Sequence, residues 1–171
     1  MNNSWSGSRV CGVDVSAGNV RSTNLDDGTN IPNYIIFYMG VNDFKYPATL
    51  GVYDGNGSIP TDSSNFREAY TISLNNIMTK YPNAKVLVGT IMQHQYTNVI
   101  GFPVKNSNSV LLKDFNNAIK DIANVFGCEV IDFEKCGLDY YNLATYAGDG
   151  QLHPNPSGMD LMFKEALKSF S

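Results

Sequence analysis

An acid and a histidine, four residues apart, stand just before the last helix expected in this 171-residue chain. Asp149 and His153 belong to the segment Asp-Gly-Gln-Leu-His-Pro-Asn, in which Pro154 directly follows the histidine. Proline fixes its own φ and disfavours helical geometry in the residue before it, so His153 should lie in a rigid loop. A carboxylate on one imidazole nitrogen fixes the tautomer and stabilises the imidazolium. The segment is therefore either the base and acid of a hydrolytic triad or a capped turn that leads into a helix.

A second polar segment, Gly40-Val-Asn42-Asp43, follows the apolar run Tyr34–Met39. Ligands of open parallel sheets bind beyond the carboxyl ends of the strands, which is where both polar segments should lie. An Asn side-chain amide at that edge is a neutral donor that can stabilise a developing oxyanion. Asn and Asp also favour ordinary turns for backbone reasons, so this segment by itself indicates no more than a turn.

The elements that must position these residues alternate along the chain as strand and helix. Apolar runs predict strands at Tyr34–Met39, Lys85–Ile91 and Cys128–Phe133, and the first run is apolar enough to be buried on both faces. Apolar residues at helical spacing predict three amphipathic helices. Their stripes are Phe66, Tyr70, Leu74, Ile77, Met78 and Tyr81, then Leu111, Phe115, Ala118, Ile119, Ile122 and Phe126, then Met159, Met162, Phe163, Ala166, Leu167 and Phe170. Strands separated by such helices indicate parallel βαβ units and an α/β fold.

Composition and charge limit the classes of function. The chain is 43% hydrophobic and 16% charged, which is typical of a folded protein, and residues 1–171 are expected to form a single domain. The net charge of −4 argues against nucleic acid as a partner. No apolar run reaches the roughly 18 residues of a membrane span. Three cysteines without C-x-x-C spacing predict neither a disulfide framework nor a zinc site, and His94 is expected to be a solvated loop histidine. No cofactor or metal is expected, and the sequence does not specify a compartment.

Together, the two polar motifs resemble those of the SGNH hydrolases, the GDSL-type esterases and lipases. That family has a flavodoxin-like parallel sheet in three α/β/α layers and four motif blocks: a nucleophilic serine, a glycine, Gly-x-Asn-Asp and Asp-x-x-His. The resemblance implies that His153 is the general base, Asp149 its orienting acid and Asn42 an oxyanion donor. It also makes Gly7 a second donor, through its backbone N–H. The acid and the histidine are four residues apart here instead of three, and Asp139 is the fallback acid.

The block with the nucleophilic serine has no counterpart in this sequence. In the family that serine lies upstream of the glycine block, in a Gly-Asp-Ser-like motif, and no Gly-Asp-Ser occurs anywhere in this chain. We therefore expect an N-terminally truncated SGNH domain from which the N-terminal strand or strands are missing. The first strand is central in the order 2-1-3-4-5, so its loss would leave Tyr34–Met39 at an edge. An apolar edge invites pairing with another chain, which predicts a possible homodimer.

The resemblance implies a serine esterase scaffold that acts on a small-molecule or carbohydrate ester, with a short-chain acyl group such as a sugar acetyl. Nucleic acid and membranes are not expected as partners. The alternative is a catalytically inactive remnant or binding domain of the same fold, because the serine is absent. A flavodoxin-like nucleotide or flavin binder is disfavoured, because no Gly-rich phosphate loop follows any predicted strand.

Overall fold

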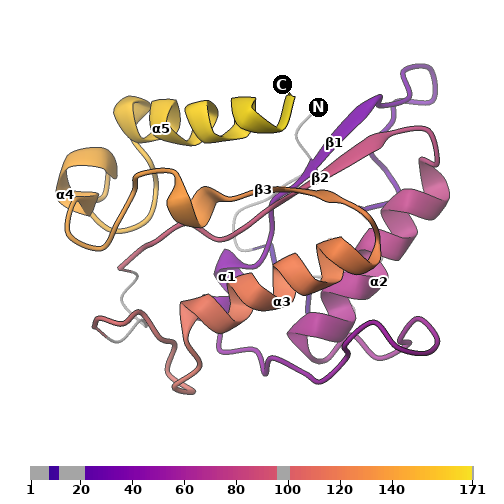
Figure 1. The fold of residues 1–171 in the computed structure, drawn as a ribbon, viewed down its shortest axis with the longest axis horizontal. Helices are drawn as coiled ribbons and strands as arrows, with labels where there is room; N and C mark the ends of the chain where they lie inside the picture. The colour runs from indigo at the N-terminus through magenta and orange to yellow at the C-terminus, as the bar shows by residue number, and fades with distance from the viewer. Residues whose placement is uncertain (1–7, 12–21, 96–100, 171) are drawn as a thin grey trace.

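The computed structural model describes residues 8–11, 22–95 and 101–170 and contains a parallel β-sheet between two layers of helices (Figure 1). In the described residues the strand order is β1-β2-β3, with β1 at an edge. Ile36 of β1 is in register with Leu87 of β2, and Val88 of β2 with Val130 of β3. The strands are β1 (Tyr34–Phe37), β2 (Lys85–Gly89) and β3 (Glu129–Ile131). Each of them ends two residues before its predicted end.

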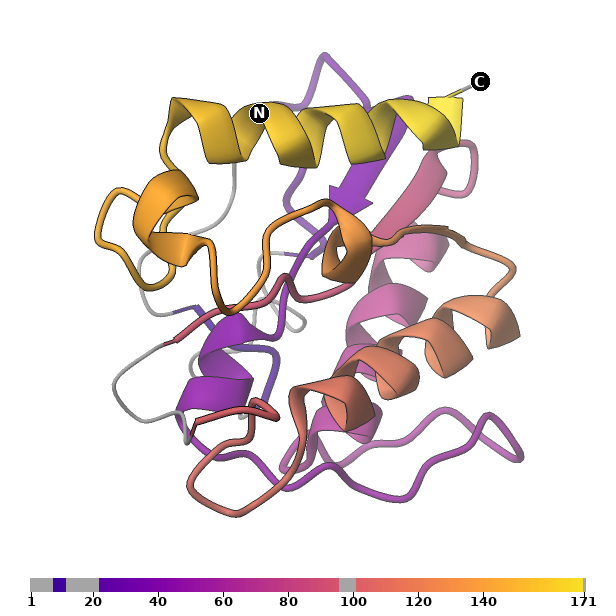
Figure 2. The ribbon, with the colours of Figure 1, turned by 60° about the vertical axis from the view of Figure 1, so that its left-hand side comes forward.

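Helices α2 and α3 cover one face of the sheet and α5 lies on the other, as Figures 1 and 2 show from two directions. The helices are α1 (Val41–Lys45), α2 (Phe66–Lys80), α3 (Leu112–Val125), α4 (Leu143–Tyr146) and α5 (Pro156–Leu167), with 3-10 turns η2 (Phe133–Lys135) and η3 (Lys168–Phe170). This arrangement confirms the predicted α/β class and its three layers. The short helices α1 and α4 were not predicted, because each is too brief to show a periodic apolar pattern.

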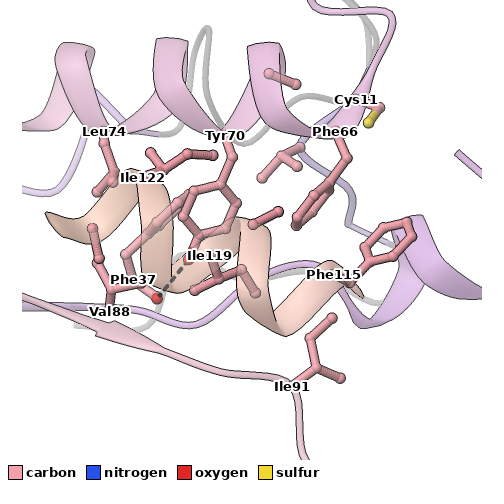
Figure 3. Close-up of a cluster of buried hydrophobic side chains, with 14 of the residues drawn as sticks. Cys11, Phe37, Phe66, Tyr70, Leu74, Val88, Ile91, Phe115, Ile119 and Ile122 are labelled. Atoms are coloured by element: carbon pink, nitrogen blue, oxygen red, sulfur yellow. Dashed lines mark hydrogen bonds between the residues drawn. The ribbon is translucent and has the colours of Figure 1, made fainter. Parts of the chain in front are cut away.

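The larger core fills the space between the sheet and helices α2 and α3 (Figure 3). Tyr70 of α2 is fully buried, its ring centroid lies 4.8 Å from that of Phe37, and its hydroxyl donates to the Phe37 carbonyl at 3.5 Å. Phe66 and Phe115 pack beside it with centroids 4.6 Å apart. Complete burial of one such aromatic side chain stabilises the fold by about 2–3 kcal/mol. These contacts hold α2 and α3 on the sheet and so fix the strand ends where the site forms.

Only one face of β1 is buried, although its sequence is apolar at every position. Ile35 and Phe37 point into the larger core, whereas the side chains of Tyr34 and Ile36 are 59% and 51% exposed. A single helix covers the second face, and it packs over β2, β3 and η2, where Leu87 is fully buried. The prediction that this strand is buried on both faces is therefore wrong.

Helix α5 buries only part of the predicted stripe, together with Leu161. Leu161, Met162 and Ala166 pack on the smaller core beneath the helix. The rest of the predicted stripe is exposed: Met159, Phe163, Leu167 and Phe170. The α5 side of the molecule therefore carries an apolar surface that continues to the exposed face of β1, since the ring centroids of Tyr34 and Phe170 are 5.7 Å apart.

The three cysteines are free thiols, and those of Cys11 and Cys136 are buried. Burial raises the pKa of Cys11, Cys128 and Cys136, which makes these thiols poor nucleophiles. Within the described ranges, no three His, Cys, Asp or Glu side chains gather in a way that could hold a metal ion. None of the helices in those ranges has the length and apolar character needed to cross a membrane.

Candidate active site

The loop that carries His153 is tied at both ends to the helices beside it. The backbone carbonyl of His153 accepts from the N–H of Gly148 at 2.7 Å, and the N–H of Asn155 donates to the carbonyl of Tyr146 at 2.8 Å. The Asn155 side chain then caps α5 by accepting from the N–H of Gly158 at 3.0 Å. The loop therefore holds the imidazole in a fixed place between α4 and α5.

The structure brings Asp149 and His153 into direct contact. One carboxylate oxygen of Asp149 (Oδ2) lies 2.6 Å from Nδ1 of His153. The other oxygen (Oδ1) accepts the backbone N–H groups of Gln151 at 2.9 Å, Leu152 at 2.8 Å and His153 at 3.1 Å. The four-residue spacing is thus accommodated by a tight turn that folds back over its own carboxylate. Asp139, the fallback acid, instead accepts the backbone N–H of Tyr141 at 2.8 Å.

The surroundings of Asp149 keep its carboxylate charged. Burial acts to raise its pKa, but the N–H groups of Leu152 and Gln151, together with His153, hold the pKa of Asp149 well below its usual range. An ionised carboxylate can only accept, so Nδ1 of His153 is the donor of the pair. The His153 side chain is 73% exposed, and Nε2 has no hydrogen bond to any described residue. Such an imidazole presents a free lone pair at Nε2 to a neighbouring proton donor.

Asn42 lies on α1, directly after the turn that ends β1. Gly40 makes this turn with a φ of 120°, a backbone conformation that residues with a side chain rarely adopt. The amide nitrogen of Asn42 (Nδ2) donates to the backbone carbonyl of Ser8 at 2.9 Å. That contact orients the amide, and an amide nitrogen has a second N–H that can serve another acceptor.

Asp43 connects a segment of the N-terminal region to α1 through hydrogen bonds. Its buried carboxylate accepts the backbone N–H groups of Val10, at 3.1 Å, and Cys11, at 2.9 Å. Burial raises the pKa of Asp43, and the N–H groups of Cys11 and Val10 act in the opposite direction. Gly7 itself lies outside the described residues. The described residue that Asn42 contacts in the N-terminal region is Ser8, and the predicted role of Gly7 stays a prediction.

His94 is fully buried, so the prediction of a solvated loop histidine is wrong. Its ring lies edge-on against Phe44 of α1, with centroids 5.5 Å apart, and Nδ1 lies 3.0 Å from the carbonyl oxygen of Met92. Burial lowers the pKa of His94, which favours the neutral ring, and Nε2 has no hydrogen-bond partner among the described residues. The polar residues around His94 in the sequence gave no sign of this burial, because the covering ring comes from a different segment.

Gln95 joins the segment after β2 to the His153 loop. Its backbone N–H donates to the carbonyl of Gln151 at 2.9 Å, and its side-chain amide donates to the carbonyl of Tyr140 at 2.7 Å. The neighbouring His94 contacts Phe44 of α1, so the residues after β2 touch both α1 and the His153 loop. Helices α1 and α4 lie at the same end of the sheet, towards which the strands point (Figures 1 and 2). Gln95 could not be predicted from the sequence, since an isolated glutamine in a loop carries no pattern.

The fold is a parallel α/β sheet with helices on both faces, and the comparisons identify the family to which the chain belongs. The chain belongs to the GDSL-like Lipase/Acylhydrolase family, whose sequence model matches residues 1–161. The match confirms the resemblance to the SGNH hydrolases. No curated protein matches the sequence.

Several solved structures share the fold. A protein from Lactobacillus plantarum is similar with a TM-score of 0.76 and 22% identity, over 96% of this chain and 76% of that one. A carbohydrate esterase family 3 protein from Talaromyces cellulolyticus gives a TM-score of 0.60 and 16% identity, over 96% of this chain and 67% of the other. A peptidoglycan O-acetylesterase gives a TM-score of 0.62 and 13% identity, over 89% of this chain and 40% of the acetylesterase chain. At these identities the likeness establishes the fold alone.

Proposed function

We propose that this chain is the scaffold of an SGNH-type serine esterase for short-chain acyl esters, with a carbohydrate acetyl ester as the expected substrate. The observation that carries the proposal is the contact of 2.6 Å between Asp149 and Nδ1 of His153, on a loop joined through Gln95 to the segment beside α1. Two similar structures are named for a carbohydrate esterase and a peptidoglycan O-acetylesterase, which supports the choice of acetyl ester.

In the proposed mechanism His153 moves the protons and Asn42 stabilises charge. Nε2 of His153 takes the proton of a serine hydroxyl as its oxygen adds to the ester carbonyl. The second amide N–H of Asn42 and the backbone N–H of Gly7 donate to the resulting oxyanion. The imidazolium, stabilised by Asp149, then protonates the departing alkoxide. Water repeats the sequence on the acyl-serine, releasing the acid and restoring the hydroxyl.

We further propose that the nucleophilic serine is absent from these 171 residues. The chain contains no Gly-Asp-Ser segment, and Ser8, the described serine next to Asn42, is buried, with 7% of its surface exposed. In this proposal the chain alone forms no acyl-enzyme, although it keeps the base, the acid and the oxyanion donor. The alternative is a catalytically inactive remnant or binding domain that shares the fold and keeps the pocket but cannot form an acyl-enzyme, whereas the esterase scaffold does so in its complete form.

The first experiment combines a fluorophosphonate probe with hydrolysis of p-nitrophenyl acetate. For the 171-residue chain we expect neither an adduct nor turnover. The matched pair of variants is His153→Ala and Gln151→Ala, since both change the same loop and only one removes the base. An adduct on one serine, with turnover that is lost in His153→Ala and kept in Gln151→Ala, would contradict the proposal that the chain lacks the nucleophile.

A second measurement tests the pocket without requiring turnover. Nitrogen-15 NMR should show His153 with its proton on Nδ1, and titration with methylphosphonate, an analogue of the oxyanion, should shift the signals of both His153 and the Asn42 amide. The His153 shift should weaken in Asn42→Ala and persist in Asn56→Ala, a change in a distant exposed loop. A proton on Nε2, or no response to methylphosphonate, would contradict the proposed roles of His153 and Asn42.

A further inference from the structure

Three aromatic side chains form an exposed cluster near the His153 loop, which we call the aromatic platform: Phe102, Tyr140 and Tyr141. The ring centroid of Phe102 lies 5.8 Å from that of Tyr140 and 5.7 Å from that of Tyr141. The ring centroids of the two tyrosines are 5.4 Å apart. Tyr141 is 77% exposed and Phe102 is 63% exposed, whereas Tyr140 is half-buried against the core. Large rings in mutual contact are seldom left this exposed unless the surface has a partner.

A network of hydrogen bonds fixes the backbone under the platform. The Asp139 carboxylate accepts the N–H groups of Tyr141 at 2.8 Å and Asn142 at 3.1 Å. The Asn142 side chain accepts the N–H of Asp139 at 2.9 Å and donates to the carbonyl of Gly137 at 2.8 Å. Since this turn is already ordered, a ligand that settles on Tyr141 does not have to order the loop first.

Gln95 connects the platform to the candidate active site. Its side-chain amide donates to the carbonyl of Tyr140, and its backbone N–H donates to the carbonyl of Gln151, two residues before His153. Gln95 therefore links the turn that carries the platform to the loop that carries His153.

We infer that the aromatic platform binds a neutral sugar ring of the ester substrate. The inference rests on the proposed function, because it assigns a place to the carbohydrate part of that substrate. The C–H groups on one face of a sugar ring can pack on the electron-rich face of an aromatic ring, and Tyr141 offers such a face to solvent.

An acyl chain fits the platform less well than a sugar. Apolar ligands occupy concave sites that bury most of their surface. Rings as exposed as Tyr141 and Phe102 stand out from the surface instead of enclosing a chain. The three residues of the platform are also far fewer than the roughly 20–30 that each partner contributes to a stable protein interface.

The test measures binding of ester-free oligosaccharides, xylohexaose and chitohexaose, to the 171-residue chain by titration calorimetry and NMR. We expect at least one of them to bind, with affinity reduced about five- to tenfold in Tyr141→Ala, the size of one lost aromatic contact. Tyr141→Phe should retain the affinity, because it keeps the ring. Tyr34→Ala is the matched control, since it removes another exposed tyrosine, from the edge strand β1, and should leave the oligosaccharide affinity unchanged.

Failure of the platform and failure of the esterase proposal give different results. Oligosaccharide binding that Tyr141→Ala weakens supports the platform, whatever the outcome with esters. Absence of oligosaccharide binding, or binding that Tyr141→Ala leaves unchanged, overturns it even if the pocket responds to methylphosphonate. Binding of hexanoate that depends on Tyr141, without oligosaccharide binding, would assign the rings to the acyl group and would also overturn it.

Discussion

The two carboxylate oxygens of Asp149 have separate partners. Oδ1 accepts three backbone N–H groups of its own turn, and Oδ2 is left for the imidazole of His153. The same side chain therefore builds the loop and orients the base. Replacement by asparagine separates these roles, because an amide keeps one accepting oxygen but places an NH₂ group, which cannot accept from Nδ1–H, opposite His153.

We expect Asp149→Asn to lower the stability of the folded state at neutral pH by about 1 kcal/mol. This loss is smaller than that expected for a fully buried hydrogen bond to a charged group, because the Asp149 side chain is 39% exposed and solvent screens its charge. The unfolded carboxyl has a pKa of about 3.9 and the folded one a lower pKa, so its contribution is complete above the unfolded value and is lost as pH falls through the folded value.

Thermal unfolding at pH 7 and pH 2 measures this effect. A loss of about 2–4 °C in Tm at pH 7 should become smaller at pH 2. The control Asp160→Asn removes an exposed acid of α5 that pairs with Lys164 at 3.4 Å, and it should leave Tm nearly unchanged at both values. A deficit in Asp149→Asn that stays constant with pH would contradict the role of the charge.

At this scale the sequence was informative where a site residue and its partner are close along the chain. Asp149 and His153 are four residues apart, and the proline after the histidine indicated a loop, so their contact could be predicted. The burial of His94 could not be predicted, because it depends on Phe44, which lies 50 residues away in the sequence. The same holds for Asp43, whose partners Val10 and Cys11 carry no pattern that links them to it.

At the scale of elements, the turn between β1 and α1 determines where Asn42 stands. Gly40 has a φ of 120°, and a Cβ there would lie 3.0 Å from Cδ1 of Ile91 and 3.1 Å from Cζ of Phe66. The turn therefore needs glycine both for its backbone conformation and for the close packing around it. The glycine was noted in the sequence as part of a motif, but the two contacts come from elements that only the fold brings together.

Gly40→Ala should destabilise the protein by about 2–3 kcal/mol, the sum of a left-handed backbone and an overpacked core. Gly57→Ala is the matched control, because Gly57 has a φ of 88° but nothing lies within 4 Å of the Cβ position. It should show only the backbone effect, about 1 kcal/mol. Urea unfolding measures the free energy of unfolding of both variants, from the shift of the midpoint at an unchanged m-value. Equal losses of stability in the two variants would mean that the contacts around Gly40 contribute nothing.

Strands and helices could be predicted because their apolar patterns lie within short stretches of sequence. The faces that they bury depend on which other strands and helices pack against them. The apolar run of β1 predicted burial on both faces, yet Ile36 is 51% exposed because α5 covers mainly the other two strands. In α5 the sequence offers apolar residues on more than one side. The choice of Leu161 and Met162 over Phe163 follows from the position of the smaller core.

At the scale of the whole molecule, the uncovered apolar surface is continuous. It runs from Tyr34 and Ile36 on the edge strand to Phe163, Leu167 and Phe170 at the α5 side. An apolar edge strand is a template for pairing with another chain, and soluble proteins usually block such edges with charge or cover them. We propose that a second copy of the chain covers this surface, which makes the protein a homodimer.

The expected result is a dimer in sedimentation velocity at tens of micromolar protein and a monomer for Ile36→Lys. The lysine places a charge in the middle of the exposed face of β1, while its long side chain can reach solvent in the monomer without disturbing the larger core. Val52→Lys is the control: Val52 is 90% exposed in the loop between α1 and α2, away from the edge, so the dimer should persist. A wild-type chain that sediments as a monomer at these concentrations would contradict self-association. A dimer that survives Ile36→Lys would move the interface away from β1, and the edge strand would then need a different partner.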